Sequence, residues 1–341
     1  MSALQRMFND CRKKKRFYDV LVPFSGGKDS TYALYLCKKK FGLRCLAVTF
    51  DNGFLSDLAR ENIKNTIARL GVDHVFYQVD WSLLKGLYRL FFLKTGFFCP
   101  VCMRGIQVAT EMAAEAFRIP LIINGTCLRS EEYVGQEYFV DGSLGFFKSV
   151  LKGETLEKSA QAFFLGARWK RKMGYRFFRM TKSDRLLFNA SINLPDYIEW
   201  DYNEIYGTIA SELGWRSYRE KQEHLDCKMS DLVGYFRQRK FPALIPELLR
   251  YSKLVSAGLM SKEEASAQIN KIQGGFDVEN GLEFFQEKLG ISWDELNTVL
   301  ADPLRHMKYV KQGTSVTWKR LRSAYYFWLN LFFKLIGKSA K

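Results

Sequence analysis

The chain has 341 residues, of which 47% are hydrophobic, so it is long enough to bury a sizeable core. Residues 1–16 are polar and basic and the seven cysteines are an odd number, so we expect neither a secretory signal nor disulfide bonds. A net charge of +16, from 52 Lys and Arg against 36 Asp and Glu, suits an anionic partner: RNA, a nucleotide sugar or an anionic membrane.

Apolar runs alternate with helical stretches over the first 126 residues. Strands are predicted at 18–24, 44–50, 74–79 and 119–123, and helices at 31–40, 55–70 and 109–117. Gly71 follows the second helix as a C-cap signal. Strands that alternate with helices pair in parallel through right-handed crossovers. The sequence therefore predicts an α/β fold, a Rossmann-like doubly wound parallel sheet followed by a mostly helical C-terminal region.

The first predicted strand leads directly into a glycine-rich loop. The loop consists of Ser25, Gly26, Gly27, Lys28, Asp29 and Ser30. Adjacent glycines let backbone N–H groups approach an anion, and the hydroxyl groups and the lysine add donors and a positive charge. The following helix, expected to start near Ser30, directs its positive end to the same place. We therefore predict a site for a nucleotide polyphosphate, the alternative being a polar turn without a ligand.

The other strands end in residues that should lie close to this loop. The second strand ends at Phe50 and Asp51, and the fourth is followed by Gly125. Ligands of doubly wound sheets collect at the carboxyl ends of the strands. We expect the loop, Asp51 and Gly125 to converge there, and Gly125 to let the backbone approach the nucleotide. A simple strand-end turn is the alternative for Gly125.

Cys99 and Cys102 form a Cys-x-x-Cys pair. A thioredoxin role is not expected, because the pair does not follow a strand into a helix of that fold. A closed zinc site needs four ligands, and His224 and Cys227 would complete it. Cys99, Cys102 and a third cysteine would instead suit an iron–sulfur cluster with an open iron; Cys127 lies just beyond the fourth strand. Two cysteines without a metal are the remaining alternative.

The loop resembles the PP-loop signature, Ser-Gly-Gly-x-Asp-Ser, of the ATP pyrophosphatase superfamily, which includes GMP synthetases, asparagine synthetases and tRNA-thiolating enzymes. Four later segments resemble the N-acetyl sugar amidotransferase family of surface-polysaccharide (LPS, O-antigen) biosynthesis: residues 195–202, 213–215, 223–227 and 256–265. Two features depart from that family. Only Cys11 precedes the first strand, where members often carry a zinc knuckle, and the Cys-x-x-Cys pair is more similar to that of the tRNA thiolases.

The resemblance implies an adenine nucleotide alpha-hydrolase-like fold with ATP and Mg²⁺ as cofactors. The resemblance implies that ATP is bound by the following residues: Ser25, Gly26, Gly27, Lys28, Asp29, Ser30, Phe50, Asp51 and Gly125. In the implied reaction an acetamido oxygen of an N-acetylated nucleotide sugar attacks the α-phosphorus of ATP, and ammonia then expels AMP to leave an acetamidino sugar. Lys28 would stabilise the leaving pyrophosphate and Asp29 would hold Mg²⁺, while Asp51 would bind the same ion or the ribose.

Ammonia needs a source, and nothing in the sequence predicts a glutaminase within the chain. The resemblance implies separate subunits like the glutaminase and the cyclase of imidazole glycerol phosphate synthase. A tRNA-thiolating enzyme that uses Cys99 and Cys102 is the alternative function. In that case the basic, aromatic segment 166–185 would bind RNA phosphates. A nucleotide-binding protein without catalysis is a third hypothesis.

We expect four parts in the chain: a basic segment at 1–17, a PP-loop nucleotide-binding domain at 18–150, a mostly helical substrate or partner region at 151–312, and a basic aromatic amphipathic helix at 313–341. The apolar part of the last helix is too short to span a bilayer. It would lie in the membrane interface, or pack on the protein itself or a partner. The expected location is cytoplasmic, with peripheral contact at the inner face of the membrane as a further hypothesis.

Overall fold

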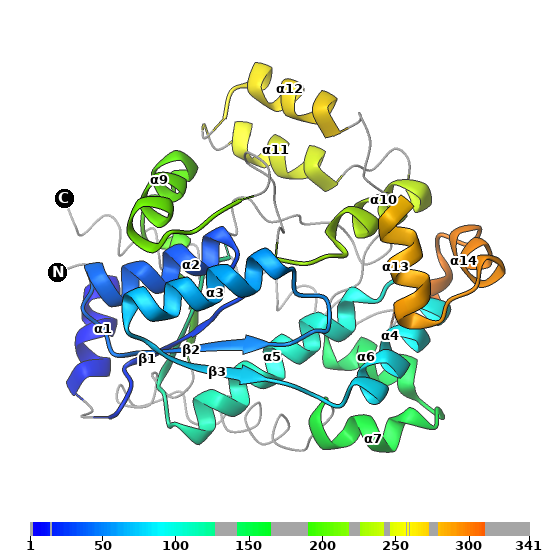
Figure 1. Ribbon diagram of the computed structural model, residues 1–341, viewed down its shortest axis with the longest axis horizontal. Coiled ribbons are helices and arrows are strands. Elements are labelled where there is room, and N and C mark those ends of the chain that lie inside the picture. Colours follow the sequence, from blue (N-terminus) through cyan, green and yellow to red (C-terminus); the bar gives the residue numbers. More distant parts are fainter. Residues whose placement is uncertain are drawn as a thin grey trace, which may run out of the picture.

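A parallel sheet of five strands forms the centre of the molecule (Figure 1). The computed structural model describes residues 3–13, 16–126, 142–164, 190–217, 226–241, 246–256, 258, 260–272 and 279–310. The strand order is β3-β2-β1-β4-β5, so β1, which precedes the glycine-rich loop, is the central strand. The strands are β1 (Val20–Pro23), β2 (Cys45–Phe50), β3 (Asp73–Tyr77), β4 (Leu121–Asn124) and β5 (Ala190–Asn193).

Both faces of the sheet are buried at β1, β2 and β4, which explains why these strands are apolar runs. Val20 and Val22 of β1 lie in one hydrophobic core and Leu21, between them, lies in the other. Leu46 and Ala47 of β2 divide in the same way. Successive side chains of a strand point to opposite faces, so β1, β2 and β4 each contribute to two cores.

One face of the sheet is covered by helices that surround the glycine-rich loop. They are α1 (Ala3–Lys13), α2 (Lys28–Tyr35), continued by the π-helical turn η1 (Leu36–Lys40), α3 (Asp57–Leu70) and α9 (Tyr202–Leu213). Ser56 caps α3 by accepting a hydrogen bond from the Ala59 N–H at 3.0 Å, and Gly71 ends it in the left-handed conformation. The predicted C-cap is therefore confirmed. Helix α9 packs on both α2 and α3 (Figure 1).

The opposite face is covered by a phenylalanine-rich layer. Its helices are α4 (Trp81–Thr95), α5 (Cys99–Ala116), α6 (Leu144–Leu151) and α7 (Leu156–Phe163). The rings of Phe91 and Phe147 lie 4.5 Å apart between α4 and α6. Helix α5 packs closely on β2, because a methyl group on Gly105 would lie 2.3 Å from the ring of Phe50.

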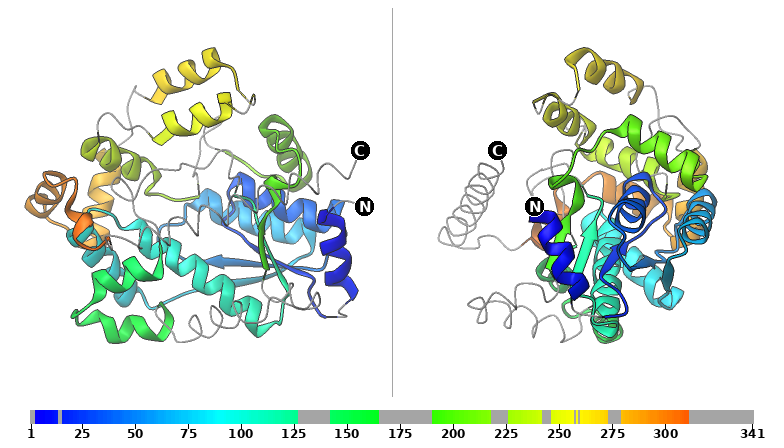
Figure 2. Two further views of the ribbon diagram at one scale, coloured as in Figure 1. Left: turned by 180° about the vertical axis from the view of Figure 1, so that it is seen from behind. Right: turned by 90° about the vertical axis from the view of Figure 1, so that its left-hand side faces the viewer.

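The remaining described elements follow β5. They are η3 (Leu194–Asp196), α10 (Ser230–Lys240), α11 (Pro246–Ser256), α12 (Lys262–Ile272), α13 (Glu279–Leu289), α14 (Trp293–Leu300) and η4 (Arg305–Lys308). Helices α13, α14 and η4 pack against α4, whereas α11 and α12 pair with each other farther from the sheet (Figure 2). Among these described helices, none is both long enough and apolar enough to cross a membrane.

The predicted α/β fold is confirmed, and the largest differences from the predicted boundaries are at the starts of two helices. Helix α2 begins at Lys28, three residues before the predicted start, and α5 begins at Cys99 rather than at residue 109. Helix α4 and strand β5 were not predicted. The predicted basic segment 166–185 and the C-terminal helix 313–341 lie outside the described residues. The division into domains at 150 and 312 stays a prediction.

Candidate nucleotide site

The glycine-rich loop turns between the end of β1 and the start of α2. Gly26 has a φ of +79°, and a methyl group there would lie 2.6 Å from the carbonyl oxygen of Ala59 on α3. Both the conformation and the close approach require glycine. The Ser25 Oγ accepts from the Gly27 N–H at 3.3 Å, and the Ser30 Oγ donates to the Gly27 carbonyl at 3.1 Å. The two serines therefore hold the turn in shape from within.

Lys28 and Asp29 occupy the first turn of α2, at its positive end. The Lys28 Nζ lies 2.8 Å from Asp29 Oδ2 and 4.9 Å from the centre of the Tyr202 ring. The Lys28 side chain is only 6% exposed, so its charge is held in a fixed place beside the loop. The other oxygen of Asp29 accepts a hydrogen bond from the Trp200 Nε1 at 2.9 Å.

Gly125 closes the loop from the end of β4. A methyl group on Gly125 would lie 2.5 Å from the carbonyl oxygen of Asp29 and 3.0 Å from the Ser30 nitrogen. Real side chains do not approach a backbone this closely, so the position requires glycine. The structure thus brings Gly125 and the loop together, as the convergence of strand ends predicted; its part in ATP binding stays a prediction.

Two tryptophans at the ends of α9 contact the loop. Trp215 follows the helix, and its Nε1 donates to the Gly26 carbonyl at 2.8 Å. Trp200 precedes the helix and donates to Asp29, as described above. Neither was predicted as a site residue, although both lie in the segments that carry the family resemblance. A tryptophan in an otherwise polar stretch, next to a strongly helical segment, was the available signal.

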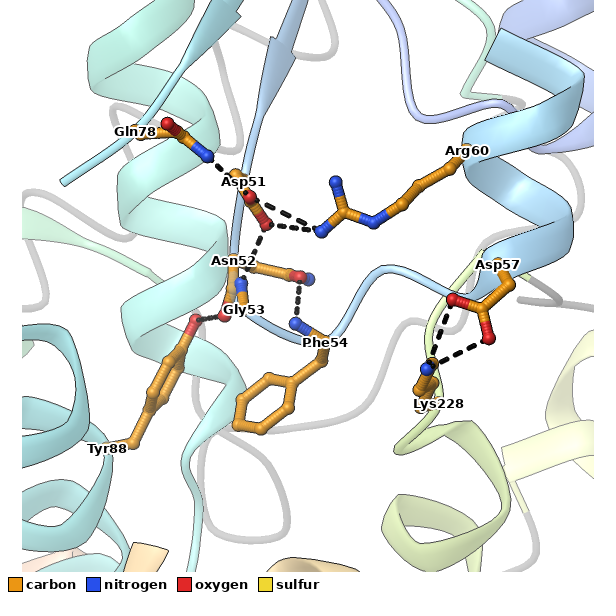
Figure 3. Close-up of polar contacts among 9 residues, drawn as sticks. All are labelled: Asp51, Asn52, Gly53, Phe54, Asp57, Arg60, Gln78, Tyr88 and Lys228. Atoms are coloured by element: carbon orange, nitrogen blue, oxygen red, sulfur yellow. Dashed lines mark hydrogen bonds and ion pairs between the residues drawn. The ribbon is translucent and has the colours of Figure 1, made fainter. Parts of the chain in front are cut away.

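Asp51 lies at the carboxyl end of β2, next to the central strand (Figure 3). Its carboxylate accepts from the Gly53 N–H at 3.0 Å and from the Gln78 Nε2 at 3.1 Å, and it lies 3.4 Å from the Arg60 guanidinium. Three donors thus hold an anionic group at the carboxyl edge of the sheet, where ligands of doubly wound sheets collect. The Phe50 side chain packs in the core against α5, so a contact between Phe50 and a nucleotide would come from its backbone.

Comparison with known proteins identifies the family. Residues 232–325 match the family described as "LPS biosynthesis protein WbpG-like, C-terminal domain". Over 269 residues the chain is 34% identical to the uncharacterized protein MJ1599 of Methanocaldococcus jannaschii, a match that covers 79% of this chain and 78% of that protein. The chain belongs to the same family as MJ1599, and its residues 232–325 match the WbpG-like C-terminal domain. The loop described above has the Ser-Gly-Gly-x-Asp-Ser pattern, and the predicted relation to LPS biosynthesis proteins is confirmed at residues 232–325.

One solved structure has a weaker similarity to this chain than MJ1599 has. The U34-tRNA thiolase NcsA of Methanococcus maripaludis, solved with its 4Fe–4S cluster, aligns with a TM-score of 0.38 and 14% sequence identity. The alignment covers 81% of this chain and 82% of the thiolase. A likeness this low carries no argument about the chemistry of the present protein.

Three cysteines lie near the end of β2. Cys99 and Cys102 start α5, and Cys227 precedes α10; all three are partly exposed. The Asn52 Nδ2 donates to the Cys102 Sγ at 3.2 Å. Burial, with a further contribution from the neighbouring Cys99, raises the pKa of the Cys102 thiol to about 12. Burial and then Cys102 also raise the pKa of Cys227. As they stand, these groups are protonated thiols at neutral pH.

The predicted metal site is only partly covered by the structure. His224 and Cys127 lie outside the described residues. Within the described part of the chain, no three His, Cys, Asp or Glu side chains are arranged so that they would hold a metal ion. A metal that binds thiolates must displace the thiol protons. The zinc or iron–sulfur site at Cys99, Cys102, His224 and Cys227 therefore stays a prediction.

A short antiparallel bridge joins the segment before α10 to the end of β2. Leu55 pairs with Cys227, the Ser56 N–H donates to the Asp226 carbonyl at 3.0 Å, and the Lys228 N–H donates to the Phe54 carbonyl at 2.8 Å. The Lys228 side chain also lies 3.2 Å from the Asp57 carboxylate on the first residue of α3 (Figure 3). The bridge thereby brings a cysteine of the second half of the chain beside the nucleotide-binding sheet.

Proposed function

We propose that the protein is an ATP-dependent ligase that converts the acetamido group of an N-acetylated nucleotide sugar into an acetamidino group, with release of AMP and pyrophosphate. The match of residues 232–325 to the WbpG-like C-terminal domain of LPS biosynthesis proteins supports a sugar substrate. The single observation that supports ATP chemistry most strongly is the glycine-rich loop at the start of α2, which carries Lys28 and Asp29 and is closed by Gly125.

In this proposal adenylation makes a poor electrophile reactive. Nitrogen donates electrons into an acetamide carbonyl, so ammonia does not displace its oxygen unaided. The carbonyl oxygen attacks the α-phosphorus of ATP, and the bond to the β-phosphate oxygen breaks with its electrons on pyrophosphate. Ammonia then adds to the imidate carbon, the C–O bond to AMP breaks, and the nitrogen loses a proton. The product is an acetamidine.

The loop residues suit the first step. Lys28 is buried beside the loop and aligned with the positive end of α2, so it stabilises negative charge that develops on the leaving pyrophosphate. Mg²⁺ bound with ATP would neutralise phosphate oxygens further. The carboxylates on these elements are of the ligand type that Mg²⁺ prefers. Asp29, the predicted ligand, would have to release Lys28 or Trp200 to bind the ion, because each of its oxygens has one of these partners.

The ammonia source is proposed to be separate glutaminase and cyclase-like subunits. This part of the proposal comes from the family resemblance. The identity of the acceptor sugar and the presence of a metal at the cysteines are proposed on the same basis. We also propose that residues 313–341 make peripheral contact with the inner face of a membrane. Such contact would suit an enzyme that serves LPS assembly.

An assay of ATP conversion to AMP and pyrophosphate tests the proposal. Wild-type protein should release pyrophosphate only when an N-acetylated nucleotide sugar is present, and it should turn over repeatedly and form AMP only when ammonium is added as well. Lys28→Ala should abolish release while the protein stays folded, and Asp29→Ala should do the same. Lys64→Ala, which removes an exposed lysine of α3, is the control and should keep full turnover. Full turnover by Lys28→Ala would contradict the assignment of the loop.

A tRNA-thiolating activity is the second candidate, because three thiols lie close to the nucleotide sheet. Binding to RNA phosphates should weaken by orders of magnitude over a modest rise in salt. Salt-dependent tRNA binding, together with tRNA-stimulated AMP formation and no response to sugars, would favour this candidate. ATP binding without AMP formation from either substrate would instead favour a nucleotide-binding protein without catalysis.

A further inference from the structure

Asp226 lies where the antiparallel bridge reaches the loop side of α3. Its carbonyl oxygen accepts from the Ser56 N–H at 3.0 Å, and two residues later the Lys228 N–H donates to the Phe54 carbonyl at 2.8 Å. Hydrogen bonds on both sides of the Leu55–Cys227 pair fix the backbone of the segment. The direction of the Asp226 side chain is therefore set by the fold.

That side chain faces the glycine-rich loop. A methyl group placed on Gly27 would lie 3.7 Å from the Asp226 Cγ and 3.8 Å from its Oδ1, which is van der Waals contact. Asp226 is half-buried, and no residue in the described part of the chain donates a hydrogen bond to its carboxylate. A half-buried acid thus lies against the backbone that is expected to surround phosphate.

The other carboxylates at this edge of the sheet already have partners. Asp29 is bound by Lys28 and Trp200, one on each oxygen. Asp51 is bound by Arg60, Gln78 and the Gly53 N–H. Each of these acids would lose a hydrogen bond or ion pair in order to bind a cation. Asp226 would lose none that the described residues make.

A carboxylate and a phosphate repel each other unless a cation lies between them. Mg²⁺ in nucleotide sites is typically held by one or two carboxylates together with phosphate oxygens of the substrate. We infer that Asp226 is a carboxylate ligand of the Mg²⁺ that accompanies ATP, at the Gly27 end of the loop. The inference rests on ATP being the nucleotide of the proposed function, and it adds a metal ligand to that site from the second half of the chain.

Asp226→Asn tests the inference, because it removes the charge and keeps the shape. Binding of α,β-methylene-ATP to the full chain is measured by calorimetry, with a chelator and then over a Mg²⁺ titration. Without metal, the variant should bind at least as tightly as wild type, since a negative charge has been removed. The Mg²⁺ concentration that gives half of the maximal gain in affinity should rise at least about tenfold. The same shift should appear in Mn²⁺ binding followed by electron paramagnetic resonance.

Asp57→Asn is the matched control, because Asp57 lies beside the same bridge but is 82% exposed and pairs with Lys228. It should leave the Mg²⁺ dependence unchanged. Asp226→Glu, which keeps the charge on a longer side chain, should fall between wild type and Asp226→Asn. Thermal unfolding of each variant checks the fold, which should persist because the bridge uses backbone groups.

Wild-type Mg²⁺ dependence in Asp226→Asn would overturn the inference and leave the proposed function standing. A loss of affinity by Asp226→Asn in the chelator that equals its loss in Mg²⁺ would also overturn it, since the residue would then contact the nucleotide directly. Failure of the wild-type protein to bind the ATP analogue under any condition would overturn the proposed function and the inference together.

Discussion

Two segments from the second half of the chain contact the glycine-rich loop, and they do so with opposite chemistry. The ends of α9 supply neutral donors: Trp215 donates to the Gly26 carbonyl and Trp200 to Asp29. The bridge supplies a carboxylate, Asp226, beside Gly27. Donors that satisfy acceptors of the loop fix its shape, whereas an acid without a partner among the described residues adds a charge that a ligand can neutralise. One segment therefore supports the loop, and the other is suited to meet the ligand.

The largest expected effect comes from disturbing the glycine-rich loop, which both segments contact. Gly125→Ala would place a methyl group 2.5 Å from the Asp29 carbonyl, so α2 or β4 must move. We expect a loss of unfolding free energy of about 3 kcal/mol, at the upper end for overpacked sites, together with loss of ATP binding. Chemical denaturation and calorimetry measure the two effects.

Gly207→Ala in the middle of α9 is the control for that substitution. Nothing lies within 4 Å of a methyl group there, so the variant should gain about 0.5–1 kcal/mol and bind ATP normally. Normal stability and normal ATP binding in Gly125→Ala would show that α2 and β4 tolerate displacement. The loop would then not need a fixed shape, and the contacts from the two segments could not be compared by their effect on it.

A buried lysine at the end of α10, the helix that follows the bridge, should make the stability of the protein depend on pH. Lys240, at the end of α10, is 4% exposed, and its Nζ lies 3.2 Å from the Thr95 carbonyl and 4.0 Å from the centre of the Phe97 ring. Burial first, then the charge of Arg305, lowers the pKa of Lys240 from 10.5 to about 7. Between these values the unfolded chain binds a proton that the folded chain does not.

Lys240 should therefore make the protein more stable as pH rises from about 7 to about 10.5, and make no contribution to the slope below 7. The expected difference over that interval is a few kcal/mol, at about 1.4 kcal/mol per pKa unit. Lys240→Met should remove this part of the slope. Denaturation of wild type and variant at pH 7 and pH 10 checks it, and equal slopes in the two proteins would contradict the prediction.

The tryptophan contacts should have a smaller effect. Trp215→Phe keeps a ring but leaves the Gly26 carbonyl without its indole donor, at a cost of about 1–3 kcal/mol for a buried acceptor. ATP affinity should fall as the loop loosens. Trp200→Phe should cost less stability, because Asp29 keeps its ion pair with Lys28. Trp293→Phe, at a side chain that is 57% exposed, is the control for both. Unchanged unfolding and ATP binding in Trp215→Phe would show that α9 does not support the loop.

The smallest effect is expected at the surface of the bridge. Lys228→Ala breaks the pair with Asp57, whose side chain is 82% exposed. Exposed pairs contribute about 0.2–1 kcal/mol, and less at high salt. The backbone bonds of the bridge should persist, so Mg²⁺-dependent ATP binding should not change. A large loss of ATP binding in this variant would mean that the bridge depends on its surface charges.

Features that depend on neighbouring residues could be predicted from the sequence. The runs at β1, β2 and β4 are strands buried on both faces, and the run at β3 pairs with β2 at the edge of the sheet. The loop was recognisable because its glycines and its charged residues are consecutive. Helix α4 was not predicted, although Ser82, Lys85 and Arg89 are spaced as on one face of a helix and the buried Phe91 and Phe92 lie on another. Strand β5, Ala-Ser-Ile-Asn, has no apolar run at all and is placed by its pairing with β4.

The contacts that complete the candidate site could not be predicted, because they join distant positions. Trp200 and Asp29 are 171 residues apart, and no spacing rule connects them. The proximity of Asp226 to Gly27 depends on the bridge at Leu55, which consists of one residue pair. Local pattern identified the loop, and only the three-dimensional structure identified what surrounds it.

The hydrogen bond from Trp215 to Gly26 spans 189 positions of the chain, and this has a consequence for synthesis on the ribosome. The loop leaves the exit tunnel early, long before α9 and the bridge have been translated. Contacts of such high sequence separation form late, because chain entropy must be lost before they contribute. A nascent chain that ends before residue 200 has neither the donors nor the acid described above. Nucleotide binding should therefore begin only when translation is well advanced, so that a truncated or stalled product does not consume ATP.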